Sequence, residues 1–131
     1  MEEDVRILPT EWVGLAVATT WGVSTKHHPK HDSHGHLDPE WHSYTDPGTL
    51  RILRQEGRSL ELLVLSGGHE AKAVGVLSTD GRRMVYATQD ETCHATIDGD
   101  TMEIEAYSRP HGSERTGGTF GVGMTTLTAK T

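Results

Sequence analysis

The sequence predicts an all-β protein, a single eight-stranded up-and-down antiparallel β-barrel with a long His-rich loop between strands one and two. Tight turns recur through residues 49–107, and Asp-Gly, Glu-Gly or Gly-Gly pairs mark them. Such pairs between apolar runs indicate hairpins, because glycine accepts the positive φ that these turns need. Eight consecutive hairpin strands leave two open edges, which disappear if the last strand pairs with the first. A sandwich or an open meander is the alternative.

The composition sets limits on the kind of protein and on its partners. A chain of 131 residues with 34% hydrophobic residues predicts one domain, residues 1–131. The formal net charge of −7, without any Lys/Arg stripe, argues against a nucleic-acid partner. No apolar run approaches the ~20 residues of a membrane span, and the acidic start lacks the pattern of a signal peptide. With Cys93 as the single cysteine, we expect a cytoplasmic protein with no membrane partner.

The strands follow one another in a simple order. Residues 1–10 are expected to form a short polar leader, and residues 12–22 are the first strand. Residues 23–48 hold three prolines and six histidines, which predict a lid loop over most of that span. The remaining strands are predicted at residues 49–55, 59–66, 70–78, 83–88, 92–97, 101–108 and 118–128.

Alternation along the strands predicts which side chains point into the barrel. The inward sets expected on strands six, seven and eight are Cys93, Ala95 and Ile97; Met102, Ile104 and Ala106; and Phe120, Val122 and Met124. The facing of strand one stays open, because an inward Trp12 would turn Val13, Leu15 and Val17 outward.

Strands three and four are apolar on both faces. Leu63 and Leu65 oppose Leu60, Leu62 and Val64, and strand four repeats the pattern. Because strands of this kind need cover on both sides, we expect a homodimer through strands three and four.

The loop lengths predict which end of the barrel is open. The turns at residues 56–58, 80–82 and 98–100 are short and share one end, which should be closed. The opposite end has the two longest loops, as expected of a mouth that admits a ligand. Eight of the nine histidines collect at that end, including His69 and His111, and only His94 lies within a strand.

The strand order and the sequence Trp12-Val13-Gly14 at the start of strand one resemble the calycin superfamily of lipocalin-like and avidin-like barrels. Lipocalins have the order Gly-x-Trp there, so this chain departs from their pattern. The segments Asp80-Gly81-Arg82 and Asp98-Gly99-Asp100 also look like those of small bacterial barrel proteins. The resemblance covers residues 11–129 and implies that a small molecule binds inside.

Several side chains are candidates for ligand contact. Trp41 and Tyr44 could fold over the mouth, or pack the loop onto the rim. The barrel lining could surround a cavity or simply be a filled core. The candidate ligand-binding residues are Trp41, Tyr44, His69, Tyr86, Met102, His111, Phe120 and Met124.

The His-rich segment could bind a transition metal through neutral imidazoles. Asp32 is a further candidate ligand. Alternatively, the same segment could act as a pH sensor, because imidazole side chains titrate near neutral pH. Cys93 is expected to be a buried, inert thiol, because His94 faces the other way. The candidate metal ligands are His27, His28, His31, His34 and His36.

The leading functional expectation is binding of a small, largely apolar ligand beneath the His-rich loop. The first alternative is a cyclase or isomerase of natural-product biosynthesis that holds a flexible substrate in a reactive shape, with no organic cofactor expected. The second alternative is a metal-binding protein. A titratable cavity group with a shifted pKa would favour the enzyme.

Overall fold

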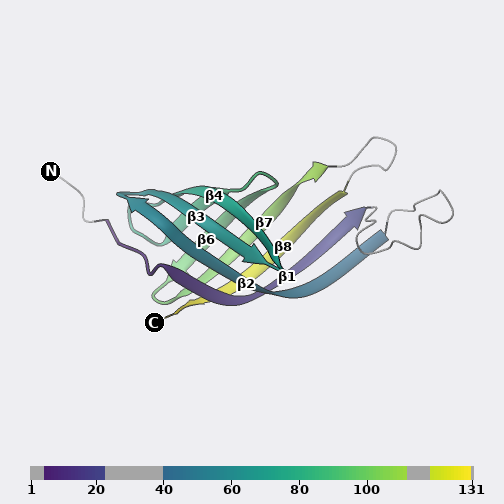
Figure 1. Cartoon of the computed structure of the whole chain (residues 1–131), viewed down its shortest axis with the longest axis horizontal. Coiled ribbons are helices and arrows are strands. Elements are labelled where there is room, and N and C mark those ends of the chain that lie inside the picture. The colour runs from purple at the N-terminus through teal and green to yellow at the C-terminus, as the bar shows by residue number, and fades with distance from the viewer. Residues whose placement is uncertain (1–4, 23–39, 112–118, 131) are drawn as a thin grey trace.

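The chain forms a closed barrel in which each strand pairs with the next and β8 pairs with β1 (Figure 1). The computed structural model describes residues 5–22, 40–111 and 119–130. All pairings are antiparallel, so the up-and-down topology is confirmed, and it is compatible with a calycin-like fold. The strands are β1 Glu11–Gly22, β2 Glu40–Glu56, β3 Ser59–Ser66, β4 His69–Leu77, β5 Arg83–Ala87, β6 Glu91–Asp98, β7 Thr101–His111 and β8 Thr119–Ala129.

Glycines with positive φ make the tight turns at one end of the barrel. Gly57, Gly81 and Gly99 have φ values of 60°, 73° and 59°. An L-residue in this conformation would bring its Cβ close to the backbone, which explains why the sequence places glycine there. The three turns share the end that the sequence predicts to be closed.

The segment before β1 closes this end of the barrel and is more than a polar leader. Leu8 is only 2% exposed and packs in the core. Its N–H donates to the Gln55 side-chain oxygen at 3.0 Å, while Gln55 donates to the Arg6 carbonyl at 2.7 Å. The Arg6 guanidinium donates to the Gly99 carbonyl at 2.7 Å. Residues 5–10 therefore tie the turns of the closed end to one another.

The strand β2 is much longer than expected, because it begins at Glu40 inside the predicted loop. Residues 40–47 pair with β1 but lie beyond the last partner of β2 on β3, which is Ser66. Pro47 is tolerated there, since its missing N–H falls on an edge with no β3 neighbour. Figure 1 shows β1 and β2 projecting together past the short strands.

The inward sets predicted for β6 and β7 are confirmed, but the set predicted for β8 is wrong. Phe120, Val122 and Met124 point outward and are 49%, 55% and 43% exposed. Leu127, which is 1% exposed, lies opposite the buried Met102. Since directly opposite residues share a face, every odd-numbered residue of β8 from 121 to 129 faces inward. An assignment from hydrophobicity alone therefore predicts the wrong inward face for β8.

Strand β1 has its most apolar side chains outside. Trp12 is fully buried, whereas Val13, Leu15 and Val17 are 37%, 57% and 50% exposed. The inward positions after Trp12 carry only small residues as far as Thr20. On β3 and β4, Leu63 and Leu65 are half-buried on the outside, and the homodimer through these strands stays a prediction.

Candidate functional site

The barrel interior divides into two halves along its axis. In the closed half, large side chains fill the space between the strands. They include Trp12, Leu50, Leu62, Leu77, Met84, Met102 and Leu127, each at most 1% exposed. In the open half, the inward positions of β1, β2 and β8 carry glycine, alanine, threonine and a few larger polar residues. This set consists of Gly14, Ala16, Ala18, Thr20, His42, Tyr44, Asp46, Gly48, Gly121, Gly123 and Thr125.

Solvent reaches the inner wall of the open half. Ala16, Ala18, Thr20 and Tyr44 all face inward, yet each remains partly exposed. The inward residues of the closed half have lost almost all solvent contact. The open half is therefore the part of the interior that a ligand from solution can enter.

A small cavity lies at the boundary between the two halves. Its volume is about 40 Å³, and its lining includes Gly48, Ser66, Tyr86, Ile104 and Thr125. This space suits one or two water molecules, because a single water needs roughly 10–15 Å³ of such volume. The Tyr86 and Ile104 side chains come from the filled half, so the cavity is the floor of the open half.

Polar groups lie on the wall above this floor. The Thr20 hydroxyl and the Tyr44 hydroxyl are 2.8 Å apart and hydrogen-bonded. The Asp46 carboxylate lies beside the β3–β4 turn, where a Cβ built on Gly67 would be 3.1 Å from Oδ2. On the β7–β8 side, the Ser108 hydroxyl donates to the Gly121 carbonyl at 3.1 Å. These groups could orient the polar part of a bound molecule.

A titratable cluster lies on β5 and β6. Tyr86 and Cys93 are directly opposite each other across the two strands. Burial raises the pKa of the Cys93 thiol to about 11; the hydrogen bond with Tyr86 opposes this rise, and the negative charge of Glu91 adds to it. Burial also raises the pKa of Tyr86 above its usual range. Both groups are therefore neutral at physiological pH, and Cys93 is poorly suited to act as a nucleophile.

Glu91 is the carboxylate of this cluster. It begins β6 and shares the inward parity of Cys93. Burial and, to a smaller extent, the neighbouring Asp90 raise the pKa of Glu91. The Thr88 hydroxyl accepts hydrogen bonds from the backbone N–H groups of Asp90 and Glu91, at 3.2 and 3.0 Å. These bonds fix the turn that places Glu91 at the open end.

The structure brings together only some of the candidate ligand-binding residues. Tyr44 and Tyr86 are inside the barrel, on the wall and the floor of the open half. Met102 is buried in the filled half. The expectation that Phe120 and Met124 line a cavity is wrong, since both are on the outer face.

The other candidates lie at the rim or outside the described residues. Trp41 is 66% exposed on the outer side of β2, and His69 is exposed where β4 begins. His111 ends β7. Within the described ranges, no group of three or more His, Cys, Asp or Glu side chains could hold a metal ion. The candidate metal ligands lie outside those ranges, and they are His27, His28, His31, His34 and His36.

Residues of the open half that the sequence interpretation missed are Thr20, Asp46, Gly48, Glu91 and Thr125. A signal for part of this set was present. Once Trp12 is placed inside, alternation along β1 puts Thr20 on the inner wall, together with the small residues at 14, 16 and 18. Asp46 and Gly48 were hidden because their segment was interpreted as a loop.

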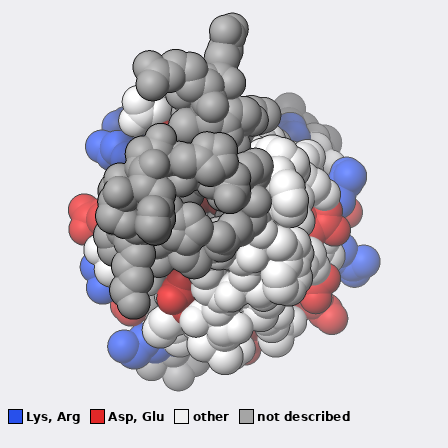
Figure 2. Space-filling model, turned by 90° about the vertical axis from the view of Figure 1, so that its right-hand side faces the viewer, with Lys and Arg blue, Asp and Glu red and all other residues white. Residues whose placement is uncertain are grey.

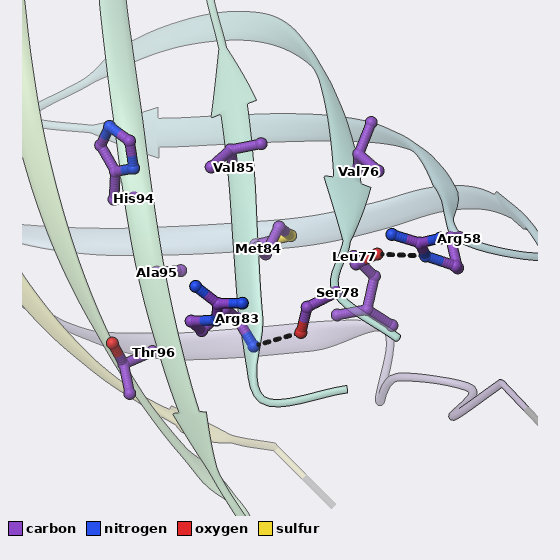
Figure 3. A pocket seen from close by; sticks show the side chains of 10 residues that line it. All are labelled: Arg58, Val76, Leu77, Ser78, Arg83, Met84, Val85, His94, Ala95 and Thr96. Atoms are coloured by element: carbon purple, nitrogen blue, oxygen red, sulfur yellow. Dashed lines mark hydrogen bonds between the residues drawn. The ribbon is translucent and has the colours of Figure 1, made fainter. Parts of the chain in front are cut away.

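A separate hollow lies on the outside of β4, β5 and β6 near the closed end. Its volume is about 260 Å³. Val76, Val85 and His94 form a row of cross-strand neighbours along it, and the Arg58 and Arg83 side chains flank it (Figure 3). The Arg58 Nε–H donates to the Leu77 carbonyl at 2.7 Å. Arg58 therefore has a structural role at the strand end.

Figure 2 views the open end of the barrel. The described charged side chains of both signs lie mainly around its outline, and much of the described surface between them is uncharged. No helix among the described residues is long and apolar enough to cross a membrane.

Comparison with protein-family models, curated proteins and solved structures finds no match to this chain. The class of protein therefore rests on the architecture itself: a closed eight-stranded antiparallel barrel with one filled and one open half.

Proposed function

We propose that the protein binds a small, largely apolar molecule in the open half of its barrel. The observation that carries this proposal is the difference between the two halves of the interior. The closed half is filled by large apolar side chains, while the wall of the open half is built mainly from glycine, alanine and threonine. Ligand sites are typically apolar concavities with a few placed polar groups, and the Thr20–Tyr44 pair and Asp46 supply such groups.

The positions of this wall carry glycine for different reasons. A Cβ on Gly14 would lie 1.8 Å from the Thr126 carbonyl oxygen, and one on Gly121 would lie 2.8 Å from the Thr19 carbonyl oxygen. Close strand approach explains both of these glycines. At Gly48, the nearest atom would be 3.5 Å away on the Thr125 side chain. Backbone packing thus leaves room for a side chain at Gly48, and its absence supports a role in keeping the cavity open.

A titration with N-phenyl-1-naphthylamine, a neutral apolar fluorophore, tests the proposal. We expect saturable binding to the wild-type protein and at least tenfold weaker binding to Gly48→Val, whose branched side chain projects into the space above the floor. Val85→Leu on the outer face of β5 is the matched control, and it should bind as the wild type does. Equal affinity of Gly48→Val and wild type would overturn the proposal, as would absence of binding in the wild type.

The cofactor-free cyclase or isomerase is a second candidate function, favoured by the cluster around Glu91. A carboxyl group whose pKa is raised by burial keeps its proton to higher pH than an exposed one, which is the property that a general acid requires. In this candidate, Glu91 exchanges a proton with the bound substrate while the cavity wall fixes the substrate's shape.

The ¹³C carboxyl resonance of Glu91 separates the two candidates. If the protein is an enzyme of this kind, the Glu91 carboxyl should titrate above the ordinary pH range of a glutamate. Its resonance should also shift when the fluorophore occupies the cavity. An ordinary titration curve and a resonance that the fluorophore does not move would remove the catalytic candidate and leave the binding proposal intact.

A further inference from the structure

The outside of β1 and β8 carries an exposed apolar surface. We define the outer apolar face as Leu15, Val17 and Trp21 of β1 with Phe120, Val122 and Met124 of β8. Each of these side chains is between 43% and 57% exposed. Trp21 lies directly opposite Phe120, and Val17 lies directly opposite Met124. The six side chains therefore form one continuous surface across two paired strands.

The uncharged character extends beyond these six residues. Every outward position of β1 from residue 13 to 21, of β8 from 120 to 128 and of β2 from 41 to 49 is uncharged. These three strands lie side by side along the projecting part of the barrel (Figure 1). The charged residues of these three strands therefore lie outside the outward positions of these ranges.

The size of this surface matches what a stable dimer needs. About half of each side chain is exposed. With roughly 200 Å² for each of the two aromatic side chains and roughly 120 Å² for each of the four aliphatic ones, the six present roughly 450 Å², within the range of a monomer's largest patch. Val13, Trp41 and Tyr107 border it and are 37%, 66% and 47% exposed. Together with them the surface reaches roughly 700 Å², within the spread around the ~800 Å² that each partner contributes to a standard interface.

A hollow in this surface could receive side chains from a partner. It has a volume of about 410 Å³ and is lined mainly by apolar atoms of Val17, Tyr107, Val122 and Met124. The charged residue at its edge is Glu105, whose carboxylate accepts a hydrogen bond from the Tyr107 hydroxyl at 3.0 Å. This bond satisfies one oxygen of Glu105 within the chain.

The composition of the chain argues against one of its own segments as the cover. The segments of the chain that link β1 to β2 and β7 to β8 are residues 23–39 and 112–118. The first contains Val23 and Leu37 as its only large apolar residues, and the second contains none. Neither could match the apolar area of the outer face.

We propose that the outer apolar face is the interface of a symmetric homodimer. A two-fold interface brings the same surface of both copies together, so it has to be self-complementary. An uncharged apolar face meets this condition, whereas a face with net charge would repel its copy. With the two-fold axis near Val17 on β1, Trp21 of one copy packs over Val13 of the other, and Glu105 on β7, two strands away from Val17, stays toward the edge of the interface. The two sheets then stack in the way of a β-sandwich.

This surface differs from the one expected from the sequence. On β3 and β4, the exposed Val74 and Val76 border a charged pair, since Lys72 Nζ lies 2.7 Å from Glu61 Oε2. A copy packed there would have to bury this pair, which costs free energy. Among the described residues, the outer apolar face itself contains no ion pair; the Glu11–Lys130 pair, 3.8 Å apart, lies beyond Val13 toward the closed end.

Sedimentation velocity over a range of protein concentrations tests the interface. We expect the wild type to sediment as a dimer, at twice the chain mass of 14.3 kDa. Val122→Glu places a carboxylate at the centre of the face, and we expect it to raise the dimer dissociation constant at least 100-fold. Val74→Glu is the matched control, because it makes the same change at an exposed β4 position, and it should remain dimeric.

Tryptophan fluorescence gives a second readout that needs no variant. Trp12 is buried in the core, while Trp21 and Trp41 lie on or beside the face. Dilution of the wild type through the dissociation constant should shift the emission to longer wavelength and increase quenching by acrylamide. A wild type that is monomeric at every concentration would overturn the proposal. So would a dimer that Val74→Glu dissociates and Val122→Glu does not. The fluorophore titration of Val122→Glu keeps the proposed function separately testable, since the cavity lies on the other side of the sheet.

Discussion

The two ends of the barrel are built in opposite ways from the same eight strands. At the closed end, glycine turns join the strands, the Arg6 and Gln55 hydrogen bonds hold these turns together, and large buried side chains such as Trp12 fill the interior. At the open end, small inward residues and half-exposed polar groups leave the inner wall accessible. The difference indicates that the closed end supplies most of the stability, which allows the open end to keep a less densely packed wall.

The largest expected effect comes from removing the Trp12 side chain. Trp12 is 0% exposed and its indole N–H donates to the Pro9 carbonyl at 2.7 Å. We expect Trp12→Ala to lower the free energy of unfolding by about 3–5 kcal/mol, as for other large-to-small core changes. Trp21→Ala, studied at concentrations where the chain is monomeric, should cost less than about 1 kcal/mol. Urea denaturation of both variants measures the difference, and equal losses would contradict a stability concentrated at the closed end.

The second prediction concerns two glycines that face each other across β1 and β2. Gly14 pairs with Gly48, but only Gly14 lies against the backbone of β8. Gly14→Ala should force β1 and β8 apart and cost about 1–3 kcal/mol or more, as in other overpacked cores. Gly48→Ala has room and no positive φ, so we expect it to be neutral or to stabilise by up to about 1 kcal/mol.

Thermal unfolding of the two variants checks this contrast. A large loss in Gly48→Ala would mean that the open half is as densely packed as the closed half. In that case the argument for a ligand space at Gly48 would fail.

The sequence was sufficient to predict the barrel, because the turn glycines act locally. Each turn that contains a Gly with positive φ marks a hairpin. Consecutive hairpins determine the strand order, regardless of which side chains point into the barrel. The inward residues of β6 and β7 were also predicted correctly from alternation. Because Glu103, Glu105 and His94 are polar, their side of each strand was assigned to the outside and the opposite side to the interior. Where polar and apolar residues alternate strictly, sequence determines facing.

The candidate site was much harder to predict, for physical reasons that differ between strands. On β8, Phe120, Val122 and Met124 lie outside and Gly121 and Gly123 lie inside, so the rule that places apolar residues inward gave the reverse of the structure for residues 120–124. The proposed dimer would explain this inversion, because an interface is a second environment that selects apolar residues. On β2, Pro47 and the histidines suggested a loop, although an edge position tolerates proline. The sequence does not show that residues 40–47 lack a β3 neighbour.

The smallest expected effects concern two carboxylates, one at each end, whose pKa values move in opposite directions. At the closed end, the pKa of Asp80 is lowered by hydrogen bonds from the Ser78 hydroxyl and the Arg82 backbone N–H, at 2.6 and 3.0 Å. At the open end, burial and Asp90 raise the pKa of Glu91. Ionised Asp80 therefore favours the folded state, whereas ionised Glu91 disfavours it.

The two signs give opposite pH dependences of stability. The contribution of Asp80 is present above its ordinary pKa of 3.8 and is lost as the pH falls through its lower folded value. The contribution of neutral Glu91 is present below its ordinary pKa of 4.5 and is lost as the pH rises through its raised folded value. Asp80→Asn, which keeps the acceptor oxygen, should be less stable than wild type at pH 7 and equal to it in acid. Glu91→Gln should be more stable at pH 7 and equal to wild type below pH 4.5.

Denaturant unfolding of the wild type and both variants between pH 3 and pH 8 measures these differences. Because Asp80 is fully exposed, its effect should shrink with added salt, while that of the partly buried Glu91 should persist. A Glu91→Gln variant that is less stable than wild type at pH 7 would show that ionised Glu91 is held by a favourable partner. The carboxylate would then help to hold the open end folded, and the proton-exchange role considered for it would lose its physical basis.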